Sequence, residues 1–190
     1  MSLTSTDNAA ARPATVAGTC PGQLTRSVRA QVSLGLGWPK TAERVVNALR
    51  GSLPDVADLL PANVLDGDPA GYRSHLLHAE PDGSFSIVAM VWRPGQETVI
   101  HDHVAWCVTG VLQGCEYEEV FSLAEDGRAL RLAGRTVNPG GSVSGFAPPG
   151  DIHRVRNTGD GVAISMHVYG ADISRLGTSV RREYEIPVLA

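Results

Sequence analysis

The sequence predicts an all-β protein with a single domain, and three observations support this prediction. A chain of 190 residues has the length of one domain, or of one domain with an appendage. From residue 71 onwards it consists of short runs rich in β-branched residues, such as SFSIVAMVW at 84–92. Turn signals separate these runs, and the chain contains 21 Gly and 12 Pro, which favour such turns. We expect about eight to ten antiparallel strands, which a sandwich, a jelly roll or a small barrel would each accommodate.

The N-terminal part of the chain has a different pattern. Residues 1–25 are rich in Ala, Thr and Ser without any period, and they predict a disordered tail. Within residues 26–70 we expect two short helices, one beginning at Pro39 and the other near Pro54, because proline is favoured in the first turn of a helix. The β domain then occupies residues 71–190.

Composition and charge limit the partners of the protein. The formal net charge of −4 argues against the broad basic surface that nucleic acid or anionic lipid requires. The chain has neither the ~18 consecutive apolar residues of a membrane span nor the pattern of a signal peptide, so we expect a cytoplasmic protein with no membrane partner. Three cysteines, an odd number, do not indicate a disulfide framework. A small molecule is the expected partner, and the sequence does not indicate the oligomeric state.

Two histidines stand two residues apart in the run VIHDHVAWC. On a strand, His101 and His103 would share one face, so both imidazoles could bind one ion together with a third ligand from another strand. An HxH pair also occurs where the histidines only fill hydrogen-bonding positions of a sheet. The spacing alone leaves both interpretations open.

The residues around this pair resemble the first sequence motif of the cupins. Gly95, His101, His103, Cys107 and Gly114 reproduce its spacing, except that Cys107 stands where the motif usually has Glu.

The second cupin motif is similar to a later segment of the chain. Pro148, Gly150, His153 and Asn157 have its spacing, although its opening glycine is displaced by one position. Two such motifs in the right order make chance a poor explanation of the resemblance.

The cupin resemblance implies both a fold and a metal site. The fold would be an all-β cupin double-stranded β-helix, a jelly-roll barrel, with a short helical N-terminal region. The resemblance also implies that His101, His103 and His153 bind a divalent metal. With Cys107 in place of the usual carboxylate, the metal would keep its 2+ charge for an anionic ligand such as a thiolate. Alternatively, Cys107 is the fourth ligand of a zinc ion.

A narrower resemblance, to the thiol dioxygenases of the cysteine dioxygenase type, covers roughly residues 72–170. The matching segments are HDH followed by a cysteine, LQG at 112–114, HRVRN at 153–157 and SMHVY at 165–169. The resemblance implies an Fe(II) cofactor and the O2-dependent oxidation of a small thiol carboxylic acid, 3-mercaptopropionate or cysteine, to its sulfinate.

The same resemblance implies catalytic roles for four residues. Ser165, His167 and Tyr169 would form a hydrogen-bonded relay whose tyrosine hydroxyl points at oxygen and substrate, and strand alternation places all three on one face. Cys107 aligns with a family cysteine that can become joined through sulfur to the active-site tyrosine, so a Cys107–Tyr169 thioether is a hypothesis. Without a metal site, the first three residues would equally suit a polar ladder in a sheet.

The sequence departs from the family pattern in the substrate-binding residues. Arginine-type cysteine dioxygenases have Tyr-x-Arg on an early strand, and relatives acting on 3-mercaptopropionate have Gln in place of that Arg. Here the segment is Tyr72-Arg73-Ser74, and a shift of one residue turns a strand side chain to the opposite face. A guanidinium is the expected partner of a substrate carboxylate. We therefore expect Tyr72 with Arg73 or Arg175 to bind substrate, with Arg181 and Arg182 as further candidates.

Two other classes of function remain open, because one fold hosts many functions. One is a non-catalytic metal-binding or ligand-sensing cupin. The other is a cupin isomerase or hydrolase that uses zinc or manganese.

Overall fold

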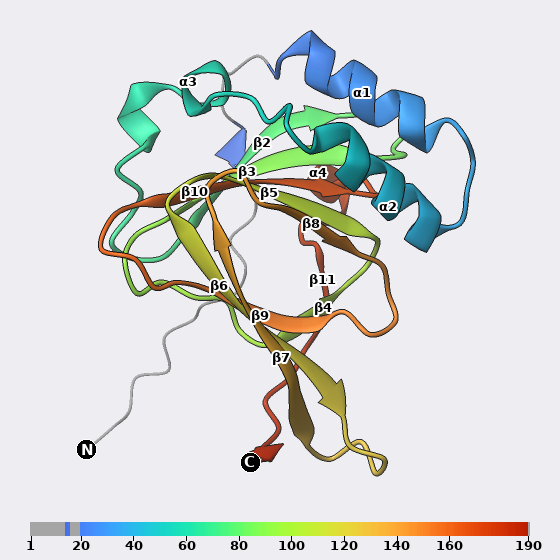
Figure 1. Cartoon of the computed structure of the whole chain (residues 1–190), viewed down its shortest axis with the longest axis vertical. Helices are drawn as coiled ribbons and strands as arrows, with labels where there is room; N and C mark the ends of the chain where they lie inside the picture. Colours follow the sequence, from blue (N-terminus) through green and yellow to red (C-terminus); the bar gives the residue numbers. More distant parts are fainter. Residues whose placement is uncertain (1–13, 16–19, 190) are drawn as a thin grey trace.

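The computed structural model describes residues 14–15 and 20–189, and strands dominate it (Figure 1). The strands are β1 (Ala14–Thr15), β2 (Arg73–Ala79), β3 (Ser86–Trp92), β4 (His101–His103), β5 (Cys107–Gln113), β6 (Cys115–Leu123), β7 (Leu130–Pro139), β8 (Val143–Phe146), β9 (Ile152–Asn157), β10 (Ala163–Tyr169), β11 (Val180–Glu183) and β12 (Val188–Leu189). The helices are α1 (Gly22–Val32), α2 (Trp38–Leu49), α3 (Val56–Leu59), a 3₁₀ turn (Ala62–Val64) and α4 (Ile173–Leu176).

The strands form two six-stranded sheets that face each other. One sheet has the order β1-β2-β3-β10-β5-β8, and the other has the order β11-β4-β9-β6-β7-β12. From β3 to β11 the chain changes sheet at every connection except the β6–β7 hairpin. This alternation is the topology of a double-stranded β-helix, so the predicted fold class is confirmed.

Helices α1, α2 and α3 cover the outer face of the first sheet (Figure 1). Helix α2 has a proline in its first turn and buries Val45, Val46 and Leu49, which recur at helical spacing. Helix α1 buries Leu24 and Val28 in the same apolar core. Without this layer, the outward apolar residues of the first sheet would face water.

Strand β10 is buried along its whole length, and its two faces differ in chemistry. Ile164, Met166 and Val168 pack into the core beneath the helices. The residues that alternate with them point the other way, into the space between the sheets: Ser165, His167 and Tyr169. The apolar face fixes the strand, and the polar face is thereby held in place.

The structure corrects the predicted element list in two respects. Helix α1 begins at Gly22, inside the segment predicted as a tail, whereas residues 1–13 and 16–19 of that segment lie outside the described residues. Its helical spacing of apolar residues is short and bracketed by polar ones, so packing on the sheet decides its structure more than propensity does. The strands are also not all antiparallel, because β1 pairs with β2 and β12 with β7 in parallel.

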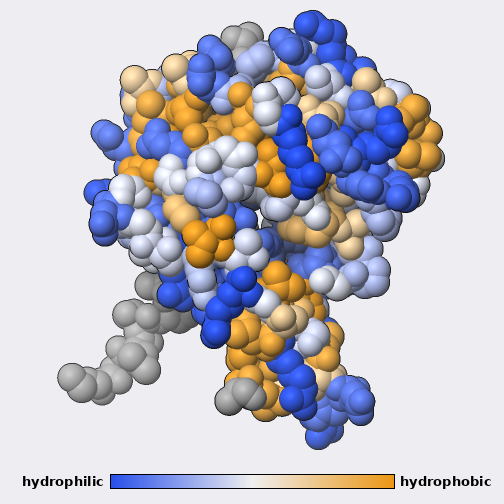
Figure 2. Space-filling model, in the orientation of Figure 1, coloured by the Kyte–Doolittle hydropathy of each residue, from blue (hydrophilic) through white to orange (hydrophobic). Residues whose placement is uncertain are grey.

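The β6–β7 hairpin projects away from the barrel, and Figure 2 shows apolar side chains gathered on it. Its exposed apolar residues and those of the adjacent β12 are Leu123, Val137, Val188 and Leu189. Strand β7 contributes no side chain to the cavity between the sheets. In the described part of the chain, no helix combines the length and the apolar character that a membrane span requires.

A close approach at Gly170 fixes the chain directly after β10. A Cβ atom at this position would lie 2.0 Å from Nε1 of Trp106, whose indole is buried in the core. We expect Gly170→Ala to lower the free energy of unfolding by about 3 kcal/mol, because the indole or the backbone must move. Denaturant unfolding measures this. In the control variant Gly134→Ala the new methyl group meets no atom within 4 Å. Equal stability of the two variants would contradict the expectation.

Candidate metal centre

A cavity of about 40 Å³ lies between the two sheets. Because one water occupies about 10–15 Å³ of such space, the cavity suits a ligand of few heavy atoms. Its lining has no Lys, Arg, Asp or Glu side chain among the described residues. The polar lining consists of histidines and hydroxyl groups: His101, His103, His153, His167, Tyr72, Ser74, Thr98, Tyr169, Thr178 and Ser179.

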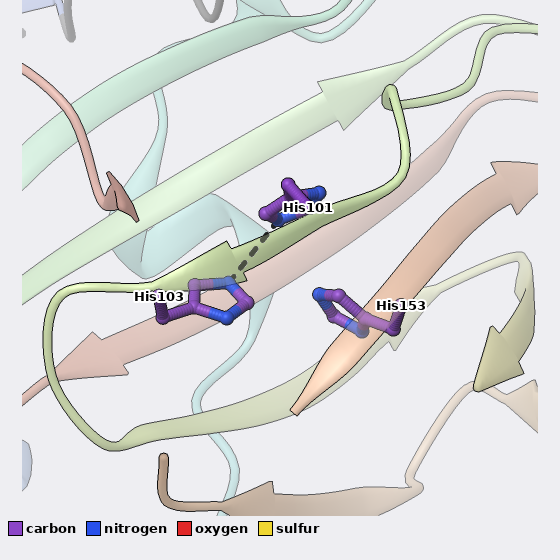
Figure 3. Close-up of side chains that lie close together, drawn as sticks. All are labelled: His101, His103 and His153. Carbon is purple, nitrogen blue, oxygen red and sulfur yellow. Dashed lines mark hydrogen bonds between the residues drawn. The ribbon is translucent and has the colours of Figure 1, made fainter. Parts of the chain in front are cut away.

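The three predicted metal ligands converge on one point of this cavity (Figure 3). His101 and His103 alternate on β4, and His101 pairs across the sheet with His153 on β9. All three are buried, and their ligand nitrogens lie within 4.8 Å of one another. Strand alternation and the β4–β9 register together therefore build the cluster.

Each ring of the cluster is oriented through its second nitrogen. Nδ1 of His153 lies 2.7 Å from Oε1 of Glu118, and Nδ1 of His103 lies 3.1 Å from Oδ2 of Asp151. Nδ1 of His101 lies 2.9 Å from the backbone carbonyl oxygen two residues earlier. Because these oxygens accept hydrogen bonds, each Nδ1 carries the proton and each Nε2 offers a lone pair to the cavity.

This arrangement fits a bound cation. The Nε2 atoms of His101 and His103 lie 3.2 Å apart, and with both protons on Nδ1 neither can donate to the other. Burial lowers the pKa of His101, and the neighbouring histidines lower it further. Burial also lowers the pKa of His103, although Asp151 opposes this shift. Neutral imidazoles with facing lone pairs are the form that binds a metal, so the set can hold one divalent ion.

The predicted relay lies on β10, on the opposite wall of the cavity. Nε2 of His167 lies 2.9 Å from the hydroxyl of Ser165, and its Nδ1 lies 3.4 Å from the hydroxyl of Tyr169. Burial lowers the pKa of His167 to about 3, and burial raises the pKa of Tyr169 well above its usual value. The relay therefore consists of neutral groups that exchange hydrogen bonds.

Cys107 lies beside the relay and outside the histidine cluster. It is the cross-strand partner of Tyr169 in the β5–β10 pair, and its sulfur lies 3.9 Å from Nδ1 of His167. Burial raises the pKa of the Cys107 thiol, which favours the protonated form. Among the described residues the metal-binding cluster holds three histidines and no cysteine, so the geometry does not support Cys107 as a fourth ligand.

The predicted substrate arginines do not line the cavity. Tyr72 stacks on Trp92 with ring centroids 4.4 Å apart, and Tyr72 and Ser74 both face the cavity. Arg73, which alternates with them, points away, and its Nε lies 3.0 Å from Oδ2 of Asp68. Strand alternation is the reason that this guanidinium cannot face the substrate.

Arg175 and the two later arginines also bind elsewhere. The side chain of Arg175 is 71% exposed, and its Nε lies 3.1 Å from Asp172. Arg181 forms an ion pair with Asp102, and Arg182 lies over the ring of Tyr184. These positions correct the expectation that Arg73 or Arg175 binds a substrate carboxylate.

Two acidic residues of β6 were not predicted. Glu118 orients His153, whereas Glu116, only 2% exposed, lies beside the Ser165 hydroxyl and the Trp92 indole. Oε1 of Glu116 has no hydrogen-bond partner among the described residues. Burial raises its pKa to about 7, which the contacts with Ser165 and Trp92 only partly offset. The available signal was the spacing of two glutamates on alternate positions of one strand.

The fold and this centre define a class of protein, a cupin barrel with a three-histidine metal site. A sequence model of the family described as cysteine dioxygenase type I matches residues 62–178. The chain belongs to this family. Membership makes it a thiol dioxygenase in general terms, and implies a small thiol and O2 as substrates.

Several solved structures share the barrel. A Cupin 2 conserved barrel domain protein from Salinispora arenicola CNS-205 is 24% identical, with a TM-score of 0.42 over 58% of this chain and 83% of that chain. A conserved protein with a double-stranded β-helix domain from Klebsiella pneumoniae is 15% identical, with a TM-score of 0.46 over 64% of this chain and 85% of that chain. Similarity at this level says nothing of activity.

The raised pKa of Glu116 predicts that stability falls as pH rises. Between the ordinary pKa of 4.5 and about 7, the folded chain holds a proton on Glu116 that the unfolded chain has lost. Relative to Glu116→Gln, the wild type should therefore lose roughly 2 to 3 kcal/mol of unfolding free energy between about pH 5 and about pH 8. Denaturant unfolding of the metal-free proteins measures this difference.

The matched control is Glu119→Gln, on the same strand, where the carboxylate pairs with Arg154 and the pKa is lowered. Its stability difference from the wild type should stay constant over this pH range. A constant difference for Glu116→Gln as well would show that Glu116 does not hold its proton in the folded chain.

Proposed function

We propose that the chain is an Fe(II)- and O2-dependent thiol dioxygenase that oxidises a small thiol carboxylic acid to its sulfinate. The observation that supports this most is that one small cavity carries three convergent neutral histidines on one wall and a neutral hydroxyl relay on the other. The family match supports the same reaction type.

In this proposal His101, His103 and His153 hold the metal, with Glu118 and Asp151 fixing two of the rings. Three histidines on one side leave open positions for other ligands. Bound there, Fe(II) would supply a positive charge for the substrate thiolate and the redox chemistry that O2 requires. The ligands contribute no charge of their own, so the site favours anionic substrates.

The charge balance of the cavity favours 3-mercaptopropionate over cysteine. The thiolate and carboxylate of 3-mercaptopropionate together balance a 2+ ion, and the lining offers hydroxyl donors to the carboxylate from Tyr72, Ser74, Thr178 and Ser179. Cysteine adds an ammonium group, for which the described lining has no carboxylate partner. A substrate of this size also suits the small volume of the cavity.

The catalytic residue of the relay is Tyr169, whose hydroxyl lies at the cavity with His167 behind it. We expect Tyr169→Phe to reduce kcat by about 10²-fold, because the ring keeps its packing while the hydroxyl that orients or protonates the oxygen is lost. Metal binding, measured by isothermal titration, should stay unchanged because Tyr169 is not a ligand. Unchanged turnover in the variant would remove this role.

The proposed reaction is tested by loading the protein with Fe(II) anaerobically and following O2 uptake with cysteine, 3-mercaptopropionate, cysteamine and mercaptosuccinate. We expect stoichiometric uptake and a sulfinate product, identified by mass spectrometry, with 3-mercaptopropionate. Cysteamine is the matched control, because it has the same carbon chain with an ammonium in place of the carboxylate. The metal-free protein is the second control and should be inactive.

Each other outcome of this assay identifies an alternative. Absence of uptake with every thiol, despite bound iron, would contradict the proposal and favour the ligand-sensing cupin. Turnover that needs zinc or manganese and no O2 would favour an isomerase or hydrolase.

A further inference from the structure

We propose that Glu116 is the fourth member of the relay, and that its protonation state sets the tautomer of His167 and with it the direction in which the Tyr169 hydroxyl donates. Glu116 is a positioning residue in this scheme, since it acts through Ser165 and His167. The structural part of the inference needs no substrate, whereas its catalytic consequence rests on the proposed function.

The geometry joins the two sheets. Glu116 points inward from β6, in the second sheet, and reaches the Ser165 hydroxyl on β10, in the first sheet. Its side chain is shielded from water, and one carboxyl oxygen has no other hydrogen-bond partner among the described residues. A buried carboxyl group left in this state needs a local role, because water cannot satisfy it.

When Glu116 is charged, its carboxylate can only accept hydrogen bonds. The Trp92 indole donates to the Ser165 oxygen at 3.1 Å, so the Ser165 proton is free to go to the carboxylate. Nε2 of His167 then donates to Ser165, and its Nδ1 becomes an acceptor. The Tyr169 hydroxyl consequently donates to Nδ1, away from the substrate.

When Glu116 is protonated, every donor in the chain reverses. The carboxyl group donates to Ser165, and Ser165 donates to Nε2 of His167. The His167 proton must then be on Nδ1, where it faces the hydroxyl oxygens of Tyr169 at 3.4 Å and Thr109 at 3.3 Å. The Tyr169 proton is released from this contact and can point into the cavity.

The surroundings of Glu116 place this change near neutral pH. Burial raises its pKa to about 7, and the negative charge of Glu118 adds to the shift. His167 itself stays neutral there, because burial lowers its pKa. The ionisable groups on the strands packed around Glu116 are Glu118 on β6, His153, Arg154 and Arg156 on β9, and His167 and Tyr169 on β10; the two arginines pair with Glu119 and Glu97.

The chain of hydrogen bonds gives the thiol proton a destination. A thiol that binds as its thiolate releases one proton, and Tyr169 can accept it while passing its own proton to Nδ1 of His167. His167 passes one from Nε2 to Ser165, and Ser165 passes one to Glu116. The net change is thiol to thiolate and carboxylate to carboxylic acid, with no electron transferred. Substrate binding thereby turns the Tyr169 hydroxyl towards the oxygen.

The test is the ¹⁵N NMR spectrum of the His167 ring in the full-length protein loaded with diamagnetic Zn(II), recorded across the range around pH 7. In the wild type we expect the protonated nitrogen to change from Nδ1 to Nε2 as pH rises. In Glu116→Gln the amide donates to Ser165 at every pH, so the proton should stay on Nδ1. Glu119→Gln, on the outer face of β6, should behave as the wild type.

A second variant tests the path itself. Ser165→Ala removes the link between Glu116 and His167, so the tautomer should no longer follow pH although Glu116 still titrates. A tautomer that does not change with pH in the wild type, or that changes equally in Glu116→Gln, would overturn the inference. A switch in a protein that oxidises no thiol would support the inference and contradict only the proposed function.

Discussion

The site depends on one constraint, the burial of β10 on both faces. A strand in the middle of the first sheet presents alternate residues to two environments, and here the helical layer covers one of them. Met166 and its apolar neighbours lock the strand against the helices, so His167 cannot shift without disturbing the core. The short helices at the start of the chain therefore hold the relay in place, although they contribute no residue to the cavity.

A second property follows from the absence of charged side chains around the cavity in the described residues. The carboxylates lie one layer behind, where Glu118 and Asp151 orient the metal ligands. The charge inside the cavity is then set by the metal and the substrate, and the protein supplies direction through hydrogen bonds. This explains why an arginine clamp, as expected from the family pattern, has no place in this lining.

Features that depend on local spacing were predictable from the sequence, and features that depend on tertiary contacts were not. His101 and His103 stand two apart on one strand, and the spacing of the second motif indicated His153. The outward orientation of Arg73 follows from the same alternation, because Tyr72 and Ser74 cannot face the cavity unless the residue between them faces away. Glu116, in contrast, meets Ser165 across the barrel, a contact between strands of different sheets that no local pattern encodes.

Glu116 and Glu118 show how one strand can serve both walls of the cavity. They share a face of β6, yet Glu118 lies within hydrogen-bonding distance of Nδ1 of His153, while Glu116 meets only a serine and an indole. Two carboxyl groups of the same kind thus acquire different proton affinities from their neighbours, the usual basis for dividing roles between paired acids. The charged one keeps a metal ligand oriented. The other, which is neutral or charged near pH 7, is suited to move a proton through the relay, so β6 couples the metal centre to the hydroxyl that faces it.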